Sequence, residues 1–396
     1  MRLTYLTVAD AGYFVGAVAM ANSLRLTGNE GELVVIDGGL TAAQRESLRP
    51  QARVLQLSAE DKAKHAFFQR QVVYRYGVSG VLVFVDSDML VTASLAPIVE
   101  QAANGKIVVY PNHPSGWHRF FPEWADVFEL EAPLRKQRYA NAGLVAFSTE
   151  HWPDFLERWE RACTHIDPSR IFDGNWHQPF WAGDQDALNA LLMSEVPADA
   201  IAEGDQAETL LFDSVNDGTI EDEKTLRLSL NGVPIRFIHY GLSPKAWQRQ
   251  GWRRIREDDT YARLLPRVLF ADDVAVRLRG TRVPLWIRPG PIGRLALVTI
   301  GGANTVGSMV KRRDVVPIKR RLGVLLRRLR GYVYELPQRV RYPTVTRIEY
   351  GFGFDAVPAV PNGLLAPSTY VSALYFTAPA LVSYLNCVTP VDAPAR

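Results

Sequence analysis

Two aspartates separated by one small residue follow a short apolar run in the first quarter of the chain. The run Val81–Val85 is β-branched and aromatic, and Asp86-Ser87-Asp88 comes directly after it. Such a run is typical of a central strand covered on both faces, and ligands bind at the carboxyl ends of such strands. Two carboxylates spaced in this way offer oxygen ligands to Mg²⁺ or Mn²⁺ and leave coordination positions for phosphate oxygens. The alternative is a strand-ending turn with two solvated aspartates.

A second set of polar residues lies at the ends of predicted elements later in the chain. Asp184-Gln185-Asp186 stands at the start of a predicted helix, where free backbone N–H groups and the positive end of the dipole favour acids. Capping accounts for one of these residues but not for three in succession. His239 ends a predicted strand, as the aspartates do, so its imidazole could reach the same metal, while Lys245 offers a positive charge to a phosphate. A purely structural histidine is the alternative.

Strand and helix patterns alternate in the part of the chain that leads to the two aspartates. Strands are predicted at 3–9, 33–36, 53–57 and 81–85, and helices at 13–26, from 41 and at 65–76. The helix that follows Thr41 opens with the capping-box sequence Thr-Ala-Ala-Gln. This order predicts an α/β fold with a parallel, doubly wound sheet, whose nucleotide-binding half ends at Asp86.

The same pattern continues beyond the aspartates and includes one long loop. Helices are predicted at 94–103 and from 184, and strands at 107–110, 139–147 and 235–239. The loop at 111–122 is rich in aromatic residues. These rings either stack on an acceptor sugar or hold the loop against the sheet, and the sequence leaves both interpretations open.

Length and cysteine content favour an intracellular protein of more than one unit. A chain of 396 residues exceeds one typical core. Cys163 and Cys387 lie far apart and give neither a disulfide framework nor metal-ligand spacing, and no leader-like sequence follows Met1. We therefore expect a cytoplasmic location.

Charge is divided unevenly along the chain. Residues 1–276 hold 27 Lys and Arg against 37 Asp and Glu, whereas residues 277–341 hold 16 against 2. A helix predicted within the basic stretch carries apolar residues on one face, namely Ile318, Leu322, Leu325, Leu326 and Leu329. Such a helix either lies on an anionic membrane surface or packs against the acidic body. Nucleic acid is a poor partner, because the body is acidic and the basic run lacks an RNA-binding motif.

Several short motifs, taken in order, resemble the family-8 retaining glycosyltransferases, which include glycogenin and bacterial lipopolysaccharide galactosyltransferases. The motifs are Val8-Ala9-Asp10-Ala11-Gly12-Tyr13, Asp86-Ser87-Asp88, Asn141-Ala142-Gly143, Asp184-Gln185-Asp186, and His239 with Lys245-Ala246-Trp247. The resemblance covers residues 1–250 approximately. It implies a GT-A fold, which is Rossmann-like with a mostly parallel sheet. It also implies a UDP-sugar donor, Mn²⁺ or Mg²⁺, and retaining transfer of a hexose to a carbohydrate or lipid-linked acceptor.

The resemblance assigns a role to each matching residue. The metal would be held by Asp86, Asp88 and His239, and the diphosphate by Lys245. Asp10 and Tyr13 would lie at the uracil, and the other donor-binding residues would be Ala9, Arg70, Ser87, Asn141 and Ala142. Asp184 and Gln185 would face the donor sugar and act in catalysis. We favour same-face attack by the acceptor hydroxyl with these two residues positioning the sugar, and a two-step displacement is the alternative.

The sequence departs from the family pattern at three positions. The closing motif of the family usually runs His-x-x-Gly-x-x-Lys-Pro-Trp, whereas here Gly241 comes one residue earlier and Ala246 replaces the proline. Gly12 stands where an asparagine or an acidic residue is often found. The phosphate contact of the closing loop and the base preference are therefore expected to differ from the family.

We predict a GT-A domain at 1–255, a boundary region at 256–290 and a basic C-terminal region at 291–396. The protein is expected to be cytoplasmic or peripheral at the inner face of the membrane.

Two other functional hypotheses fit parts of the sequence. The stretch Phe84-Val85-Asp86-Ser87-Asp88 matches the opening motif of haloacid-dehalogenase-like phosphatases, with Asp272-Asp273 as the late acidic pair, although that motif normally lies at the first strand. A non-catalytic protein that binds nucleotide-sugars on the same fold is the other hypothesis. It would bind UDP with a metal but would not turn over.

Overall fold

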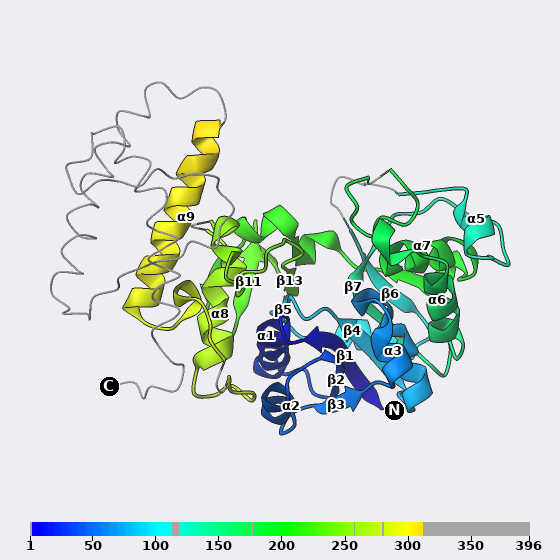
Figure 1. Ribbon diagram of the computed structural model, residues 1–396, viewed down its shortest axis with the longest axis horizontal. Coiled ribbons are helices and arrows are strands. Elements are labelled where there is room, and N and C mark those ends of the chain that lie inside the picture. The colour runs from blue at the N-terminus through cyan, green and yellow to red at the C-terminus, as the bar shows by residue number, and fades with distance from the viewer. Residues whose placement is uncertain (1, 113–118, 176, 257, 279–280, 312–396) are drawn as a thin grey trace, which may run out of the picture. The chain divides into compact units, whose positions relative to one another are not determined.

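The computed structural model describes residues 2–112, 119–175, 177–256, 258–278 and 281–311. A seven-stranded sheet forms the centre of this part of the chain (Figure 1). Its strand order is β3-β2-β1-β4-β7-β6-β8. The strands are β1 Leu3–Asp10, β2 Glu32–Gly39, β3 Arg53–Gln56, β4 Val81–Val85, β6 Ile107–Pro111, β7 Ala140–Ser148 and β8 Ile201–Glu203. Strand β7 runs antiparallel to β4 and β6, and the other neighbouring strands pair in parallel. The fold is therefore mixed α/β with a mostly parallel sheet, as the sequence predicts.

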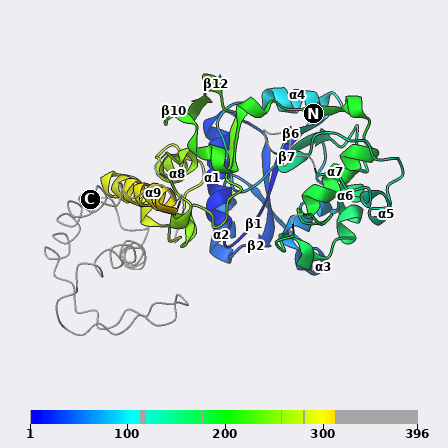
Figure 2. The ribbon, with the colours of Figure 1, turned by 90° about the horizontal axis from the view of Figure 1, so that it is seen from above.

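Strand β4 is buried on both faces, because helices cover the sheet from both sides (Figure 2). Val81, Val83 and Val85 point into one core together with α1, whereas Leu82 and Phe84 point into a second core together with α6 and α7. This explains why the run that precedes Asp86 is apolar without alternation. The helices are α1 Phe14–Leu26, α2 Ala42–Leu48, α3 Ala59–Ala63, α4 Ala96–Ala103, α5 Trp124–Val127, α6 Phe155–Thr164 and α7 Asp184–Ser194.

The capping box predicted at the start of α2 is present. The Thr41 hydroxyl accepts a hydrogen bond from the Gln44 backbone N–H at 3.3 Å, and the Gln44 side-chain carbonyl accepts one from the Thr41 N–H at 2.9 Å. Two of the N–H groups that a helix start leaves free are thereby satisfied, which fixes where α2 begins.

A small second sheet connects the aspartates to a distant part of the chain. It has the order β5-β13-β9, with β5 Met89–Val91, β9 Thr209–Leu211 and β13 Phe237–His239. The antiparallel pairing of β13 with β5 sets His239 opposite Met89. A histidine far away in the sequence is thus placed next to Asp88. A further sheet consists of β10 Thr219–Asp222, β11 Arg227–Leu230 and β12 Val233–Pro234.

The helix predicted at 65–76 is wrong. In its place the chain forms two 3₁₀ turns, η1 Ala66–Phe68 and η2 Gln71–Tyr76, after the short helix α3. Asp61 and Glu160 are buried beside this segment, and Arg75 forms ion pairs with both at 2.8 and 2.7 Å. Because two buried carboxylates require close cationic partners, these tertiary contacts override a modest helix propensity. Other 3₁₀ turns are η3 Pro168–Arg170, η4 Ala198–Ala200, η5 Gln206–Glu208, η6 Phe212–Asn216 and η7 Gly251–Arg253.

The segment 256–290, for which the sequence predicts a boundary region, packs into the same core as α1. It carries α8 Thr260–Phe270 and the turn η8 Leu285–Ile287. The Asn22 amide on α1 donates to the carbonyls of Val268 and Val276 at 2.7 and 2.8 Å, and the Trp286 indole donates to the Ala246 carbonyl at 2.9 Å. Compact packing extends to Gly301, within α9 Pro291–Lys311. The basic helix predicted around 318–329 lies outside the described residues.

The carboxyl group of Asp259, in this packed region, has a raised pKa. Asp259 is buried and caps α8, since its Oδ1 accepts a hydrogen bond from the Ala262 N–H at 2.8 Å. Its Oδ2 is buried and forms no hydrogen bond with the described residues. Burial raises the pKa of Asp259 to about 7, and the bond from Ala262 only partly opposes this rise. The folded protein therefore takes up a proton at Asp259 at a pH where the unfolded chain does not.

We predict that Asp259→Asn removes a pH-dependent loss of stability. Between pH 4 and pH 7, approximately, the folded wild type binds more protons than the unfolded chain, so the free energy of unfolding must fall as pH rises. Asparagine keeps the cap but does not ionise. Urea unfolding at pH 4.5, 6 and 8 should show the variant gaining relative to wild type, by an amount on the order of 3 kcal/mol at pH 8, since each pKa unit corresponds to about 1.4 kcal/mol. Asp272→Asn, at an exposed aspartate elsewhere in the chain, is the matched control, and parallel pH profiles for Asp259→Asn and wild type would contradict the prediction.

Candidate functional site

The two aspartates lie in a turn where the chain leaves the central sheet. The Met89 N–H donates to the Asp86 carbonyl at 3.0 Å, and the Asp86 N–H donates to the Gly143 carbonyl at 2.9 Å. The first bond closes the turn, and the second attaches it to β7. The Asp86 side chain is 35% exposed, whereas that of Asp88 is 8% exposed. One carboxylate therefore faces the solvent and the other faces the protein interior.

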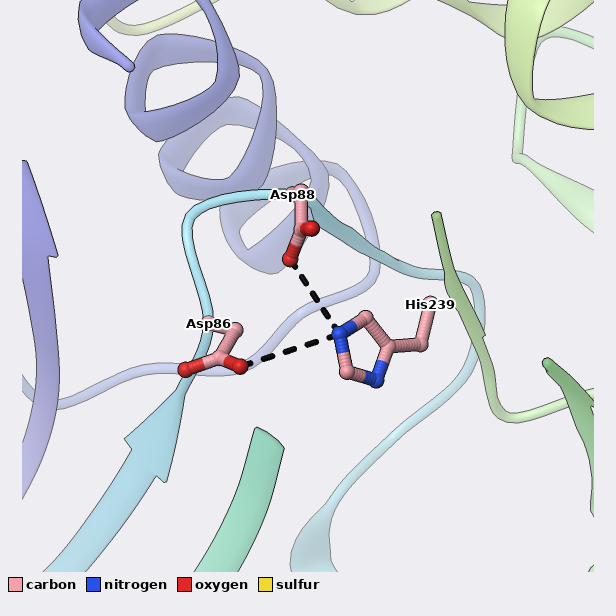
Figure 3. A group of neighbouring side chains, drawn as sticks. All are labelled: Asp86, Asp88 and His239. Carbon is pink, nitrogen blue, oxygen red and sulfur yellow. Dashed lines mark ion pairs between the residues drawn. The ribbon is translucent and has the colours of Figure 1, made fainter. Parts of the chain in front are cut away.

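His239 completes a group of three side chains that point toward one another (Figure 3). Its Nε2 lies 3.3 Å from Asp88 Oδ1 and 3.7 Å from Asp86 Oδ2. One potential ligand atom from each residue lies within 4.8 Å of the others. Burial lowers the pKa of His239, but the two carboxylates raise it more, so the net shift is upward. A divalent cation in this group would take the place of that proton.

Lys245 reaches the same turn from the loop after β13. Its Nζ donates to Asp88 Oδ2 at 2.5 Å and to the Tyr240 carbonyl at 3.1 Å, and it lies 5.8 Å from the centre of the Tyr13 ring. Burial alone would raise the pKa of Asp88, but Lys245 and His239 lower it further than burial raises it. Asp88 is thus held as a carboxylate, which is the form that binds a metal.

Arg70 connects three elements on the other side of Asp86. Its Nη1 lies 3.2 Å from Asp86 Oδ1 and donates to the Ala142 carbonyl at 2.7 Å, while its Nη2 lies 2.7 Å from Asp184 Oδ2. The guanidinium is buried and sits over the Trp159 ring at 5.5 Å. Burial raises the pKa of Asp184 to about 6 despite the opposing effect of Arg70. The arginine thereby joins the aspartate turn, β7 and α7.

A cluster of amides lies beside this arginine. Gln185 Oε1 accepts a hydrogen bond from the Ala142 N–H at 3.0 Å, and Asn141 Oδ1 accepts one from the Gly143 N–H at 2.8 Å. Asn112 Oδ1 accepts from Asn141 Nδ2 at 2.7 Å and from Gln185 Nε2 at 3.4 Å. The sequence reasoning missed Asn112. The signal was available, because Asn112 follows the buried strand β6 as Asp86 follows β4.

Only part of the Asp184-Gln185-Asp186 motif belongs to this group. Asp186 is fully buried, and Arg119 donates hydrogen bonds to both of its carboxylate oxygens at 2.8 and 2.9 Å. The Tyr139 hydroxyl donates to the same carboxylate at 2.7 Å. Asp186 is thus satisfied inside the protein, which explains the third member of the motif, whereas Asp184 and Gln185 contact Arg70 and the amides.

The first motif lies at the start of α1. Asp10 Oδ1 accepts hydrogen bonds from the Gly12 and Tyr13 N–H groups at 2.8 and 2.9 Å, so Asp10 shapes the turn that opens the helix. The Tyr13 ring lies edge-on to Trp247 at 6.0 Å. The remaining residues expected at the donor, Ala9 and Ser87, are both buried. Asp10 is exposed beside them, so Asp10 and Tyr13 stay the candidates for a nucleobase contact.

Two glycines are required by close approaches within the site. A Cβ at Gly16 on α1 would lie 2.3 Å from the Ser87 carbonyl oxygen and 2.5 Å from the Trp247 ring. A Cβ at Gly143 would lie 2.5 Å from His239 Cε1. Both distances are far below van der Waals contact. The missing side chains therefore let the aspartate turn approach α1 and let the imidazole approach β7.

The shifted glycine of the closing loop also has a local reason. A Cβ at Gly241 would lie 2.4 Å from Phe212 Cε1. The Phe212 ring lies 6.3 Å from the His239 ring, and Phe212 has a positive φ of 51°, which is unusual for a bulky residue. The chain thus packs a phenylalanine beside the histidine, and this packing requires glycine directly after Tyr240.

We predict that Gly16→Ala lowers the free energy of unfolding by about 1–3 kcal/mol and weakens binding of a divalent cation at the candidate site, because the added methyl group pushes the aspartate turn away from α1. Urea denaturation and calorimetric Mn²⁺ titration would measure the two effects. Gly302→Ala makes the same change in α9, where a Cβ meets nothing within 4 Å, and should be neutral or stabilising. Equal behaviour of the two variants would show that α1 does not constrain the turn.

No family model matches the chain, and no curated protein matches it. The chain is similar to solved glycosyltransferase structures. The galactosyltransferase LgtC in complex with donor and acceptor sugar analogues shares 15% identity over 66% of this chain and 94% of its own, with a TM-score of 0.44. The bifunctional glycosyltransferase WbbM shares 13% identity over 69% of this chain and 50% of its own, with a TM-score of 0.45. The glycosyltransferase GlyE of Streptococcus pneumoniae TIGR4 shares 14% identity over 63% of this chain and 56% of its own, with a TM-score of 0.40. Because identity and superposition are low, the functional argument rests on the side chains of the site.

Proposed function

We propose that the protein is a GT-A glycosyltransferase that moves a hexose from a UDP-sugar to a carbohydrate or lipid-linked acceptor with retention of configuration. The observation that carries this proposal is the meeting of two sets of side chains at the end of β4. One set, Asp86, Asp88 and His239, suits a divalent cation and lies beside Lys245. The other set, formed by Arg70, Asp184 and the amides, suits the hydroxyl groups of a sugar.

The donor atoms of the first set fit a divalent metal. Carboxylate oxygens suit Mg²⁺ and Mn²⁺, and the imidazole favours Mn²⁺ over Mg²⁺. Asp88 is available as an anion, since its pKa is lowered, and the Asp86 side chain is partly exposed and open to a cation. When bound, the cation would neutralise negative charge that grows on the departing diphosphate.

The side chains of the protein provide the remaining functions. Lys245 places a buried ammonium next to the metal ligands, where it can bind a phosphate oxygen as a point charge. Arg70 and Gln71 hold Asp184, so that this carboxylate is oriented and not free to rotate. Backbone and amide contacts hold Gln185 and Asn141 in the same way. A rigid polar surface of this kind can position a hexose before reaction.

The same contacts favour attack from the side of the leaving group. Among the described residues assigned to the sugar, Asp184 carries the carboxylate that could act as a nucleophile. It is buried and accepts hydrogen bonds from Arg70 and Gln71. A covalent nucleophile would have to leave these partners and give up the buried ion pair with Arg70. We therefore favour single-step, same-face attack by the acceptor hydroxyl over a two-step displacement.

The phosphatase hypothesis would require Asp272 and Asp273 beside Asp86. Instead, Asp273 pairs with Arg267 on α8 at 2.6 Å and is 54% exposed. The chain also places three strands before the one that leads to Asp86. These positions do not support a phosphatase site. A non-catalytic binding protein differs from the proposed enzyme only in turnover, so a turnover assay separates them.

We predict that Asp86→Asn lowers Mn²⁺-dependent hydrolysis of UDP-glucose or UDP-galactose by about 10²–10³-fold, which matches the loss of one charge-stabilising group. The fold should survive, because Asp86 is partly exposed. Asp88→Asn should also lose turnover but should melt earlier, since it leaves the buried Lys245 without its anionic partner. UDP release with Mn²⁺ and with a chelator, together with thermal unfolding, would measure these effects.

The exposed Asp272 offers a matched control for these substitutions. Asp272→Asn should leave UDP-sugar hydrolysis unchanged. Unaltered turnover in Asp86→Asn would refute the metal assignment, and a metal-dependent UDP complex without any turnover in wild type would identify a binding protein.

We further propose that the basic C-terminal region brings the protein to an anionic membrane at the inner face. Support comes from the excess of basic residues at 277–341 and from α9, which exposes Ile292, Leu295 and Val298 on one side. Within the described residues these are three of the five exposed large hydrophobic side chains. An apolar helix face next to basic residues suits a surface of acidic lipids. Among the helices that the structure describes, none has the length and apolar content to cross a membrane.

We predict that the full chain sediments with vesicles that contain phosphatidylglycerol at low salt but much less at 0.5 M NaCl, because each basic residue contributes about 1 kcal/mol and salt screens the attraction. Replacing Ile292, Leu295 and Val298 together by glutamine should weaken sedimentation several-fold. Thr299→Gln with Ala303→Gln, also exposed on α9, is the control. If the wild type does not sediment with acidic vesicles at low salt, the membrane proposal is wrong.

A further inference from the structure

Three aromatic side chains from two segments touch at the surface near the proposed sugar site. The centroids of the Phe67 and Phe172 rings lie 5.8 Å apart at an angle of 90°, and those of Phe172 and Trp181 lie 4.7 Å apart at 86°. His65 continues the row, with its ring 5.0 Å from that of Phe67. We call Phe67, Phe172 and Trp181 the aromatic cluster. The functional assignments above leave it without a role.

Phe172 is held in an exposed and strained position. Its side chain is 55% exposed, and no other aromatic residue is among the exposed large hydrophobics of the described chain. Its φ is 53°, a left-handed conformation that costs a bulky residue roughly 1–2 kcal/mol. The Phe172 N–H donates to the Trp181 carbonyl at 3.0 Å, which fixes this conformation. Strain that surrounding contacts enforce is concentrated at ligand clamps and other functional sites.

The cluster lies next to the Arg70–Asp184 ion pair. Phe67 comes three residues before Arg70, and Trp181 comes three residues before Asp184. Three residues span at most about 11 Å, so both rings are rooted within that distance of the pair. The ion pair therefore draws together the two segments that carry the cluster.

The loop that carries Phe172 is long but well anchored. It connects α6 to α7 and contains the turn η3 two residues before Phe172. Arg119 donates to the Gln178 carbonyl at 2.7 Å, and the Gln178 amide donates to the Arg170 carbonyl at 2.7 Å. These hydrogen bonds hold the loop that carries Phe172 and Trp181 in a defined position.

We propose that the aromatic cluster, with Phe172 at its centre, is a stacking subsite for a pyranose ring of the acceptor glycan. The inference rests on the proposed function. One face of a pyranose presents C–H groups, which pack on an exposed aromatic ring, while its hydroxyls point outward to polar neighbours. The exposed Asp173 and Asn175 lie one and three residues after Phe172 and supply such neighbours. Arg70 and Asp184, which are assigned to the donor sugar, each lie three residues along the chain from a ring of the cluster.

The test compares binding of simple sugars by the full chain with UDP and Mn²⁺ present. The probes are the methyl α- and β-pyranosides of glucose and galactose, lactose and maltose, observed by saturation-transfer NMR. Phe172→Asn removes the ring, and asparagine tolerates the left-handed backbone, so the loop should keep its shape. Wild type should give signals from the ring protons of at least one sugar, and Phe172→Asn should reduce them at least five-fold. Phe172→Trp should restore them.

Three further measurements make the outcome decisive. Val233→Asn replaces another exposed apolar residue on β12 and should leave the sugar signals unchanged. The melting temperature and the affinity for UDP should be similar in Phe172→Asn and wild type. If Phe172→Asn binds the sugars as wild type does, or loses them only together with its fold, the subsite is refuted while UDP-sugar hydrolysis still supports the proposed enzyme. If wild type binds none of the sugars, the subsite is also refuted. Absence of metal-dependent UDP-sugar hydrolysis in wild type would instead defeat the proposed function itself.

Discussion

The buried carboxylate of Asp88 is the constraint on which the rest of the site depends. A carboxylate in the interior requires cationic partners, and without one the cost is about 3–5 kcal/mol. Lys245 and His239 supply these partners from a part of the chain more than 150 residues away. The pairing of β5 with β13 and the hydrogen bond from the Tyr240 N–H to the Asp88 carbonyl at 3.0 Å hold them in place. The buried charge of Asp88 thus requires β13 and the loop after it to lie against the aspartate turn.

Arg70 provides a second tie, on the opposite side of the aspartate turn. A guanidinium can bind several acceptors in one plane, and Arg70 uses this geometry to contact Asp86, the Ala142 carbonyl and Asp184. A lysine at this position could not reach three acceptors with the same rigidity. Because Arg70 is buried, these contacts are protected from water and hold β7 and α7 against the turn.

Small residues decide how closely the parts of the site approach one another. Gly16, Gly143 and Gly241 each stand where a Cβ would overlap another group of the site. None of them has a polar side chain that could bind a ligand, and their contribution is to leave room. The approach of α1 to the aspartate turn, of β7 to His239 and of Phe212 to the closing loop all depend on that room.

Except at 65–76, the sequence alone determined the alternation of strands and helices up to Asp88, because period and burial patterns are local and strongly expressed. It also singled out Asp86, Asp88 and His239 as polar residues at the ends of apolar strands, together with Lys245, and the structure brings these side chains together. It failed at 65–76, where Arg75 and the buried carboxylates Asp61 and Glu160 replace a helix with 3₁₀ turns. These contacts join residues far apart in the chain, and no local pattern encodes them.

Only the tertiary structure separated the members of the Asp184-Gln185-Asp186 motif and revealed Asn112, Gly16 and the aromatic cluster. The role of Asp186 depends on Arg119 and Tyr139, which reach it from other segments. The role of Gly16 depends on the Ser87 carbonyl, which approaches α1 only in the folded chain. The physical reason is the same in each case. The types of side chain are written in the sequence, but which charge is neutralised, and which side chain has no room, is decided by packing between elements.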